Sequence, residues 1–264
     1  MENRDYFQGW RQNFGQILNH EDVILIDTSL FSSKYGDLCW SLYEASSFRD
    51  IDGDVINLEL DNLKVLMELF GSPKVLTIDE VLVENERVRF FLEDKLAHLD
   101  MKRNFHKKCK RPRKYQDNFG FEEESVRELS YLFQRLGISL RGSLFRPRDI
   151  KKYLTLEKIT IDVAEKTGTK VSFRERYGDR VRERPRDVVD IHTDEKLAAS
   201  ALYLSCADRK NTGVITRDSD IERIIRNSLR DPCLNGLRGS SIGTRVYYST
   251  DIGITKCTFD STQI

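Results

Sequence analysis

The sequence lacks the features that mark membrane, secreted or strongly charged proteins. No apolar run approaches the roughly 20 residues that a membrane-spanning helix needs, and the first residues carry neither the basic start nor the apolar run of a secretory signal. The five cysteines are scattered and form no Cys-x-x-Cys pair, which argues against a disulfide framework and a zinc ribbon. With 43 basic and 43 acidic residues the net charge is zero, so it does not indicate what kind of partner the protein binds. We expect a protein of the reducing cytoplasm with no membrane partner.

What the chain does contain is enough apolar material for a folded core. It has 264 residues, of which 39% are hydrophobic and 33% charged. This balance is polar but globular, and the length suits one large domain or a compact domain that carries an insertion. Any electrostatic function must then come from local segregation of charge.

Apolar spacing predicts alternating helices and strands. The predicted elements are helix 7–17, strand 23–26, a helix near 38–45, a polar turn at 50–54, helix 58–70, strand 74–77, helix 78–99, helix 121–136, a helix from 193, strand 213–216, helix 221–229 and a hairpin at 245–258. Gly137 is predicted to end helix 121–136, and Thr193 to cap the helix that follows it. No regular element is predicted for 138–190. This order indicates an α/β fold with a central parallel sheet and a C-terminal β-hairpin.

Acidic residues follow two of these strands directly. Asp27 comes after the apolar run VILI, and Asp218 follows the run GVIT after one further residue. In an open α/β sheet, sites form outside the carboxyl ends of the strands, so the two carboxylates should converge on one crevice. Glu84 and Asp194 lie near the starts of two helices and can join them. Four acids from distant sequence positions are therefore expected in one pocket.

A cluster of carboxylates needs a cation, because like charges at short range repel strongly. Mg²⁺ and Mn²⁺ prefer oxygen ligands and are often held by a few carboxylates together with substrate phosphate. With one or two such ions, the cluster suits hydrolysis of a phosphodiester bond: one ion activates the attacking water and a second stabilises the leaving oxygen.

Four sequence segments resemble the PIN-domain nucleases. They are VILIDTS at 23–29, VLVE at 81–84, TDEKLAASAL at 193–202 and GVITRDSDI at 213–221. The last two form the most specific part, because both the motif and its flanking elements fit. The resemblance implies a three-layer α/β/α fold and metal-dependent cleavage of RNA, less often of DNA. It implies catalytic metal ligands at Asp27, Glu84, Asp194 and Asp218, with Asp220 as a fifth acid.

Several neighbours compete for these roles or support them. Glu80 lies one helical turn before Glu84 and is the alternative ligand. Asp190 and Glu195 compete with Asp194, and Asp218 with Asp220 is also typical of a simple helix N-terminus. The hydroxyls of Thr28, Ser29 and Thr216 either bond the carboxylates or serve as turn and cap groups.

The resemblance leaves the middle of the chain unassigned. It covers roughly 20–100 and 188–230, so we interpret 1–264 as a single PIN-like domain and 101–187 as a basic, partly helical insertion or elaborated middle. Residues 101–116 contain no acid and eight basic residues: Lys102, Arg103, Lys107, Lys108, Lys110, Arg111, Arg113 and Lys114. Interleaved aromatic residues favour nucleic-acid contact, and a solvated loop is the alternative.

The sequence therefore predicts an endoribonuclease that uses a carboxylate-held Mg²⁺ or Mn²⁺ on single-stranded or structured RNA. The alternative is a catalytically weak PIN-like module that binds RNA or protein through the basic insertion. The sequence does not distinguish RNA from DNA, or a toxin from an RNA-processing or a defence protein. An antitoxin or other protein partner and a homodimer stay open as well.

Overall fold

The computed structural model describes residues 3–31, 45, 48–108, 120–167, 192–237, 242–250 and 253–263. The chain forms two compact units. The first comprises Met1–Asp27, Lys74–Glu80 and Leu144–Ile264, and the second comprises Thr28–Pro73 and Val81–Ser143. The mixed helix and sheet content confirms the predicted α/β class.

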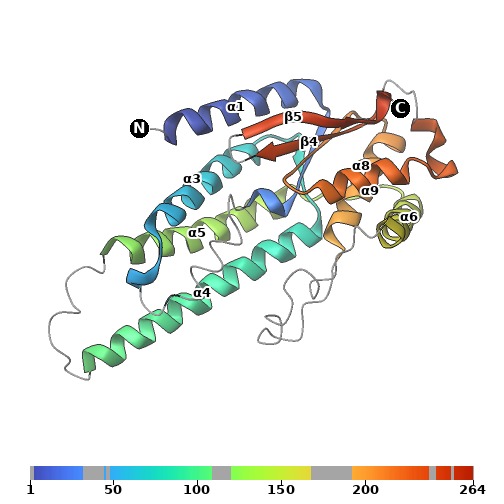
Figure 1. The fold of residues 1–264 in the computed structure, drawn as a ribbon. Coiled ribbons are helices and arrows are strands. Elements are labelled where there is room, and N and C mark those ends of the chain that lie inside the picture. The colour runs from blue at the N-terminus through green and yellow to red at the C-terminus, as the bar shows by residue number, and fades with distance from the viewer. Residues whose placement is uncertain are drawn as a thin grey trace. The chain divides into compact units, whose positions relative to one another are not determined.

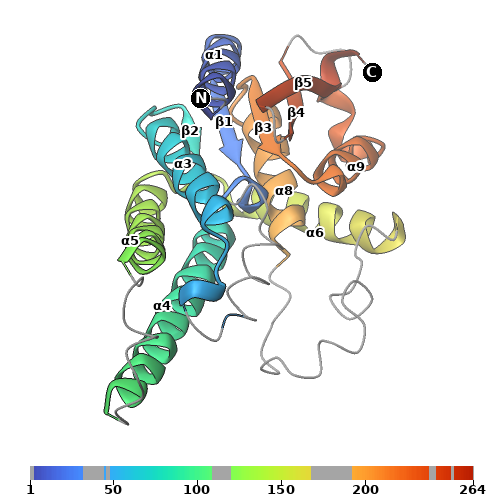
Figure 2. The same ribbon diagram turned by 60° about the vertical axis from the view of Figure 1, so that its left-hand side comes forward.

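A five-stranded sheet is the centre of the first unit (Figure 2). Its order is β2 (Val75–Leu76), β1 (Val23–Ile26), β3 (Thr212–Thr216), β4 (Thr244–Thr250) and β5 (Gly253–Asp260). The first four strands are parallel, and β5 pairs antiparallel with β4. Every residue of β1 and β3 is buried, as expected for apolar runs in the middle of a parallel sheet. The predicted strands and the C-terminal hairpin are confirmed.

Helices cover both sides of this sheet. Figures 1 and 2 show α1 (Asn3–His20) on one side, and α8 (Thr193–Cys206) with α9 (Ser219–Ser228) on the other. The Ser205 hydroxyl on α8 lies 2.8 Å from the Thr244 hydroxyl on β4, which fixes the face that α8 covers. A further helix, α6 (Ile150–Thr167), packs on α8. Being enclosed by the sheet and α6, α8 is buried nearly all round, which suits its small residues.

The predicted N-cap of α8 is wrong. His192, and not Thr193, occupies the cap position, and its side chain makes no capping hydrogen bond. The reason is the backbone: His192 has φ 53°, in the left-handed region, where histidine is among the more tolerant residues.

An aromatic cluster joins α6 to α8. The ring of Tyr153 lies 6.0 Å from that of Phe145 and 6.1 Å from that of Tyr203, between centroids. The Tyr153 hydroxyl is 3.4 Å from the Ser200 hydroxyl. Burial raises the pKa of Tyr153 to about 12, because the phenolate would lose its hydration.

This shift predicts a loss of stability in alkali. The unfolded chain releases the Tyr153 proton near pH 10.0 and the folded chain near pH 12. The contribution of Tyr153 to the free energy of unfolding is therefore intact below pH 10 and declines toward pH 12. We expect Tyr153→Phe to remove about 3 kcal/mol of this decline while keeping the ring contacts. Urea unfolding of both proteins below pH 10 and near pH 12 measures it. An equal decline in both would contradict the assignment.

Helices dominate the second unit. It contains α3 (Gly53–Leu69), α5 (Gly120–Gly142), most of α4 (Asp79–Lys108) and the short turns η1 (Thr28–Leu30) and η2 (Phe48–Asp50). Helix α3 begins five residues earlier than predicted, inside the predicted polar turn, because the Asp52 carboxylate caps it by accepting from Asp54 N at 2.9 Å. Helix α4 runs to Lys108, so the basic run begins on a helix.

Gly137 does not end its helix, contrary to prediction. Helix α5 continues to Gly142, and Gly137 is buried in its interior. A Cβ at this position would come within 3.0 Å of Glu86 Oε1 and 3.1 Å of Asn85 Nδ2 on α4. The glycine leaves room for these two side chains of α4 and does not form a left-handed cap.

Part of the unassigned middle segment is helical. Helix α6 occupies Ile150–Thr167, where no element was predicted. The segment 168–191 and the helix predicted near 38–45 lie outside the described residues, except for Ala45, which is not helical.

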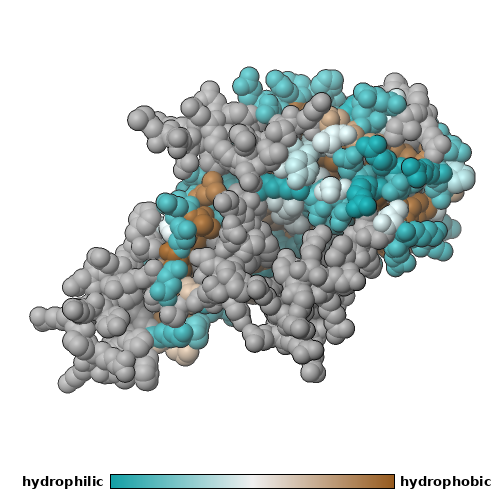
Figure 3. All heavy atoms as spheres, viewed as in Figure 1, coloured by the Kyte–Doolittle hydropathy of each residue, from teal (hydrophilic) through white to brown (hydrophobic). Residues whose placement is uncertain are grey.

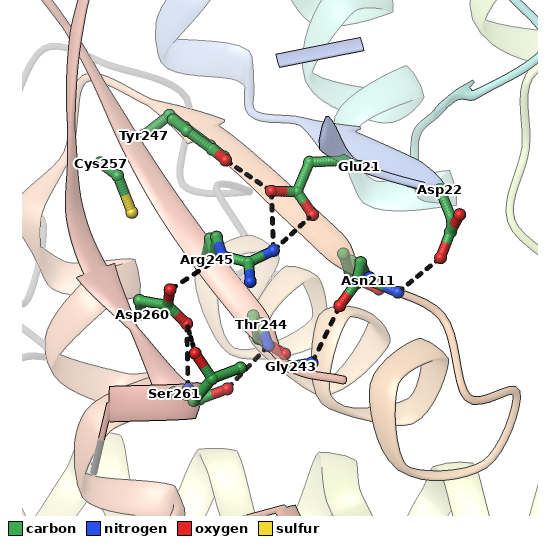
Figure 4. A network of polar contacts seen from close by, with 12 residues as sticks. Glu21, Asp22, Asn211, Gly243, Thr244, Arg245, Tyr247, Cys257, Asp260 and Ser261 are labelled. Atoms are coloured by element: carbon green, nitrogen blue, oxygen red, sulfur yellow. Dashed lines mark hydrogen bonds and ion pairs between the residues drawn. The ribbon is translucent and has the colours of Figure 1, made fainter. Parts of the chain in front are cut away.

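A polar network closes the amino-terminal end of the sheet (Figure 4). The Glu21 side chain is fully buried; it accepts a hydrogen bond from the Tyr247 hydroxyl and two from Arg245 Nη1, at 3.2 and 3.3 Å. Arg245 Nε also donates to Asp260 at 2.9 Å. Burial raises the pKa of Tyr247, so its hydroxyl keeps the proton that it donates. The network ties the start of β1 to β4 and β5.

On the face shown in Figure 3, hydrophilic side chains prevail among the described residues, and hydrophobic ones occupy small areas. Among the described helices, none is both long and apolar enough for a membrane span.

Candidate functional site

The sheet reverses its direction of growth between β1 and β3. From β1 the chain passes to β2 on one side, whereas β3, β4 and β5 extend the other side. Such a switch point opens a crevice at the carboxyl ends of the two adjacent strands, which is where α/β proteins bind ligands. Asp27 directly follows β1, and Asp218 follows β3 after one intervening residue. Two of the acids predicted from the sequence, Asp27 and Asp218, thus lie at the switch point.

Thr216 joins these two positions. Its Oγ1 donates to Asp27 Oδ2 at 2.7 Å and accepts from the backbone N of Asp218 at 2.8 Å. Asp27 is 2% exposed and Thr216 is completely buried. A hydroxyl that donates to a buried carboxylate makes a strong, oriented bond, so the direction of the Asp27 carboxylate is fixed. This contact agrees with the predicted bonding role of the Thr216 hydroxyl.

Asp218 and Asp220 form the N-terminus of α9. Asp218 Oδ1 accepts from Asp220 N at 2.9 Å, which caps the helix. Asp220 Oδ1 lies 3.7 Å from Arg223 Nη1. The helix-terminus interpretation of this pair is therefore confirmed, and metal binding by either carboxylate stays a prediction. The cap uses one oxygen of Asp218.

Two variants separate capping from metal binding at Asp218. Asparagine caps as well as aspartate, so Asp218→Asn should unfold in urea as the wild type does, whereas Asp218→Ala should lose about 1 kcal/mol. A neutral amide is a poor ligand for Mg²⁺, so if Asp218 binds a metal ion, both variants should bind the ion more weakly. An Asp218→Asn protein that binds the ion as tightly as the wild type would limit this residue to capping.

Asp194 lies over the same face of the sheet as Asp27. The Thr244 side chain on β4 faces α8, and Thr212 is its register partner on β3. Side chains alternate along a strand, so Thr216, four residues after Thr212, is on the same face of the sheet. Asp27 bonds Thr216 and is on this face too. Helix α8 leads into the start of β3 and so begins near the carboxyl edge, with half-buried Asp194 in its first turn.

The competitor Glu195 has a different environment. Its side chain is 7% exposed, and its Oε1 lies 3.4 Å from Nδ1 of His192. Asp190, the other competitor, lies outside the described residues.

Glu80 has a cationic partner that sequence reasoning missed. Lys196 Nζ on α8 donates to Glu80 Oε1 at 2.6 Å and lies 3.9 Å from Glu157 Oε1. In the sequence, Lys196 stands as a charged residue within the Ala-rich stretch of α8, and this could have indicated that it has an acidic partner. The Glu80 carboxylate thus neutralises Lys196, and the choice between Glu80 and Glu84 as the ligand stays a prediction. Glu84 is half-buried on α4 and belongs to the second unit, so its place beside Asp27 stays a prediction.

The described acids do not form a closed metal cage. Among the residues that the structure places, no three His, Cys, Asp or Glu side chains are grouped closely enough to hold an ion. Thr28 and Ser29 are half-buried in η1 of the second unit, and their role toward the carboxylates is untested.

The predicted nucleic-acid-binding run is only partly described. Lys102, Arg103, Lys107 and Lys108 lie in the last turns of α4. Lys110, Arg111, Arg113 and Lys114 lie outside the described residues.

Comparisons with known proteins add no relative. No family model matches the sequence, and neither a curated protein nor a solved structure matches the chain. The candidate site therefore rests on its residues and their geometry.

Proposed function

We propose that the protein is a metal-dependent endoribonuclease with a PIN-like fold, in which 101–187 is an insertion that contributes to RNA binding. The observation that carries the proposal is the buried Asp27 carboxylate, held by Thr216 at the switch point of the sheet. Burying a carboxylate is costly unless it has a partner, and this one is buried and oriented at the edge where α/β proteins bind ligands.

The donor chemistry fits Mg²⁺ or Mn²⁺. Asp27, Asp194 and Asp218 offer carboxylate oxygens from the ends of β1, α8 and β3 on one side of the sheet. These hard ions keep several waters and need only a few protein ligands, so an open carboxylate set suffices. Glu84 would be a fourth ligand and Asp220 a supporting acid.

Each side chain has a defined part in hydrolysis. Thr216 fixes the direction of the Asp27 carboxylate, and the α9 cap fixes that of Asp218. Negative charge at this edge attracts the cation that must accompany the RNA phosphate. Asp27, Asp194 and Asp218 would hold the ion or ions, which when bound would supply Lewis-acid chemistry to the attacking water and the leaving oxygen. The basic residues of 101–116 would offset the acidic edge by contacting neighbouring phosphates.

Cleavage of labelled nucleic acid tests the proposal. RNA and DNA carrying a 5′ label, each single-stranded and duplex, are incubated with the protein in Mg²⁺, in Mn²⁺ and in EDTA. We expect internal cuts in RNA that need either ion and are absent in EDTA. Cleavage of DNA alone would correct the substrate class. A folded protein that cuts nothing would refute the nuclease assignment.

A second candidate is a PIN-like module that binds RNA or protein without turnover. Three observations favour it: Asp218 caps a helix, Glu80 is paired with Lys196, and the described acids form no group of three. This candidate predicts RNA or protein binding that EDTA leaves unchanged and that Asp27→Asn does not alter.

A further inference from the structure

A cavity of about 220 Å³ lies in the first unit near the carboxyl end of α8, away from the Asp27 edge. It forms where α6, the end of α8 and η5 (Pro232–Leu237) meet. The residues that matter here are two cations, two thiols and two leucines: Lys152, Arg209, Cys206, Cys233, Leu156 and Leu234. Figures 1 and 2 show α6 beside α8. The two ends of this 14-residue helix are about 20 Å apart.

The charged side chains that line the cavity are both cations, and no carboxylate lines it. Three acids lie nearby: Asp149 Oδ1 accepts from Lys152 N at 3.0 Å, Asp231 Oδ1 accepts from Cys233 N at 2.9 Å, and Asp208 adjoins Arg209 in the sequence. Within the described part of the chain, neither Lys152 nor Arg209 has a carboxylate within the 4.0 Å of an ion pair. Lys152 Nζ is 3.4 Å from the carbonyl oxygen of Cys206.

Both cations affect the pKa of the Cys206 thiol. Burial raises its pKa, and Lys152 and Arg209 act against this rise, each more strongly than Asp208 adds to it. Hydrogen bonding to Asp231 raises the pKa of Cys233. Both thiols are therefore neutral near pH 7, and they leave the positive potential of the cavity intact.

The backbone conformation of Arg209 is unusual for a residue with a side chain. Arg209 has φ 55°, in the left-handed region that favours glycine at the end of a helix. A left-handed conformation costs roughly 1–2 kcal/mol for a residue with a Cβ. The turn thus accepts strain at the residue that supplies the second cation of the cavity.

We propose that this cavity binds a phosphate group, held between the Lys152 ammonium and the Arg209 guanidinium. Its volume lies below the roughly 300–1,000 Å³ of sites for drug-sized ligands, so a small phosphorylated molecule fits. A guanidinium binds two phosphate oxygens at once, and a lysine adds a point charge. The phosphate belongs either to a free small molecule or to RNA, and the experiment separates these sources.

Inorganic phosphate is the probe for the site itself. At saturating phosphate we expect the melting temperature of the wild type to rise by at least ~3 °C. Arg209→Gly is the informative variant, because glycine relieves the left-handed backbone and should not impair folding. This variant and Lys152→Gln should lose the shift. Lys151→Gln, on the same helix but outside the cavity, is the charge-matched control and should keep it.

Alkylation of the cysteines gives a local readout. Phosphate at about ten times its Kd should slow modification of Cys206 and Cys233 by about tenfold, followed peptide by peptide in the mass spectrometer. Cys257, outside the cavity, should react at an unchanged rate. Equal melting shifts in the wild type and Arg209→Gly, or unprotected cavity thiols, would overturn the proposal.

The source of the phosphate is then read from RNA binding in EDTA. If the group belongs to RNA, an oligonucleotide displaces inorganic phosphate, and Arg209→Gly weakens RNA binding severalfold. If it belongs to a free small molecule, the oligonucleotide does not compete and RNA affinity is unchanged. None of these readouts depends on cleavage, so failure of the nuclease proposal would leave this result interpretable.

Discussion

Asp27→Asn is expected to reduce RNA cleavage by at least ~100-fold without unfolding the protein. Asparagine has the size of aspartate, and its carbonyl can still accept the hydrogen bond from Thr216. In the proposed mechanism the lost charge would remove a ligand of the cation. The cation would supply several kcal/mol of transition-state stabilisation, and each 1.36 kcal/mol corresponds to a tenfold change in rate. Single-turnover cleavage of the best RNA substrate, with RNA binding measured in parallel, gives the result.

Asp22→Asn is the matched control. Asp22 flanks the same strand at its other end, where its Oδ2 accepts from Asn211 N at 2.9 Å. It carries the same charge but lies at the opposite edge of the sheet, so this variant should cleave at the wild-type rate. Equal activity of Asp27→Asn and Asp22→Asn would remove Asp27 from the site.

Glu21→Ala is expected to lower stability by about 3 kcal/mol and the melting temperature by about 10 °C. Removing one member of a buried pair leaves the other charge without compensation, here Arg245 together with the hydroxyl of Tyr247. The loss should be near the lower end of the range for buried pairs, because Arg245 keeps its contact with Asp260 and is 17% exposed. Urea and thermal unfolding measure it.

Asp22→Ala again supplies the comparison, since it removes the neighbouring but exposed acid. We expect it to cost at most about 1 kcal/mol. Below its melting temperature Glu21→Ala should still cleave, because its network is at the amino-terminal edge of the sheet. A loss no greater than that of Asp22→Ala would show that the network contributes little.

Much of the fold could be predicted because local pattern and environment agree. The run VILI at 23–26 is apolar at every position, and β1 is buried at every position. Where a residue's role depends on a distant neighbour, the sequence misled. Gly137 resembles a helix stop, yet the approach of α4 explains it. The prediction for Thr193 failed for a local reason: the adjacent His192 adopts the left-handed conformation and occupies the cap position.

The candidate site, too, could be predicted from the sequence only in part. That Asp27 and Asp218 follow strands is legible in the sequence, because an apolar run ends in an acid. The bond from Thr216 to Asp27 depends on the register of β1 against β3, which no local pattern encodes. The pairing of Glu80 with Lys196 joins residues 116 positions apart. Only the fold reveals such contacts.

The decisive experiment for the proposed nuclease is a titration of RNA cleavage with Mn²⁺. Protein stripped with EDTA is mixed with end-labelled RNA, and the cleavage rate is followed as Mn²⁺ is added. We predict no product without metal, a rate that rises and saturates with Mn²⁺, and no such rise for Asp27→Asn. Cleavage that persists in EDTA, or no cleavage at any Mn²⁺ concentration by folded protein that binds the RNA, would contradict the account.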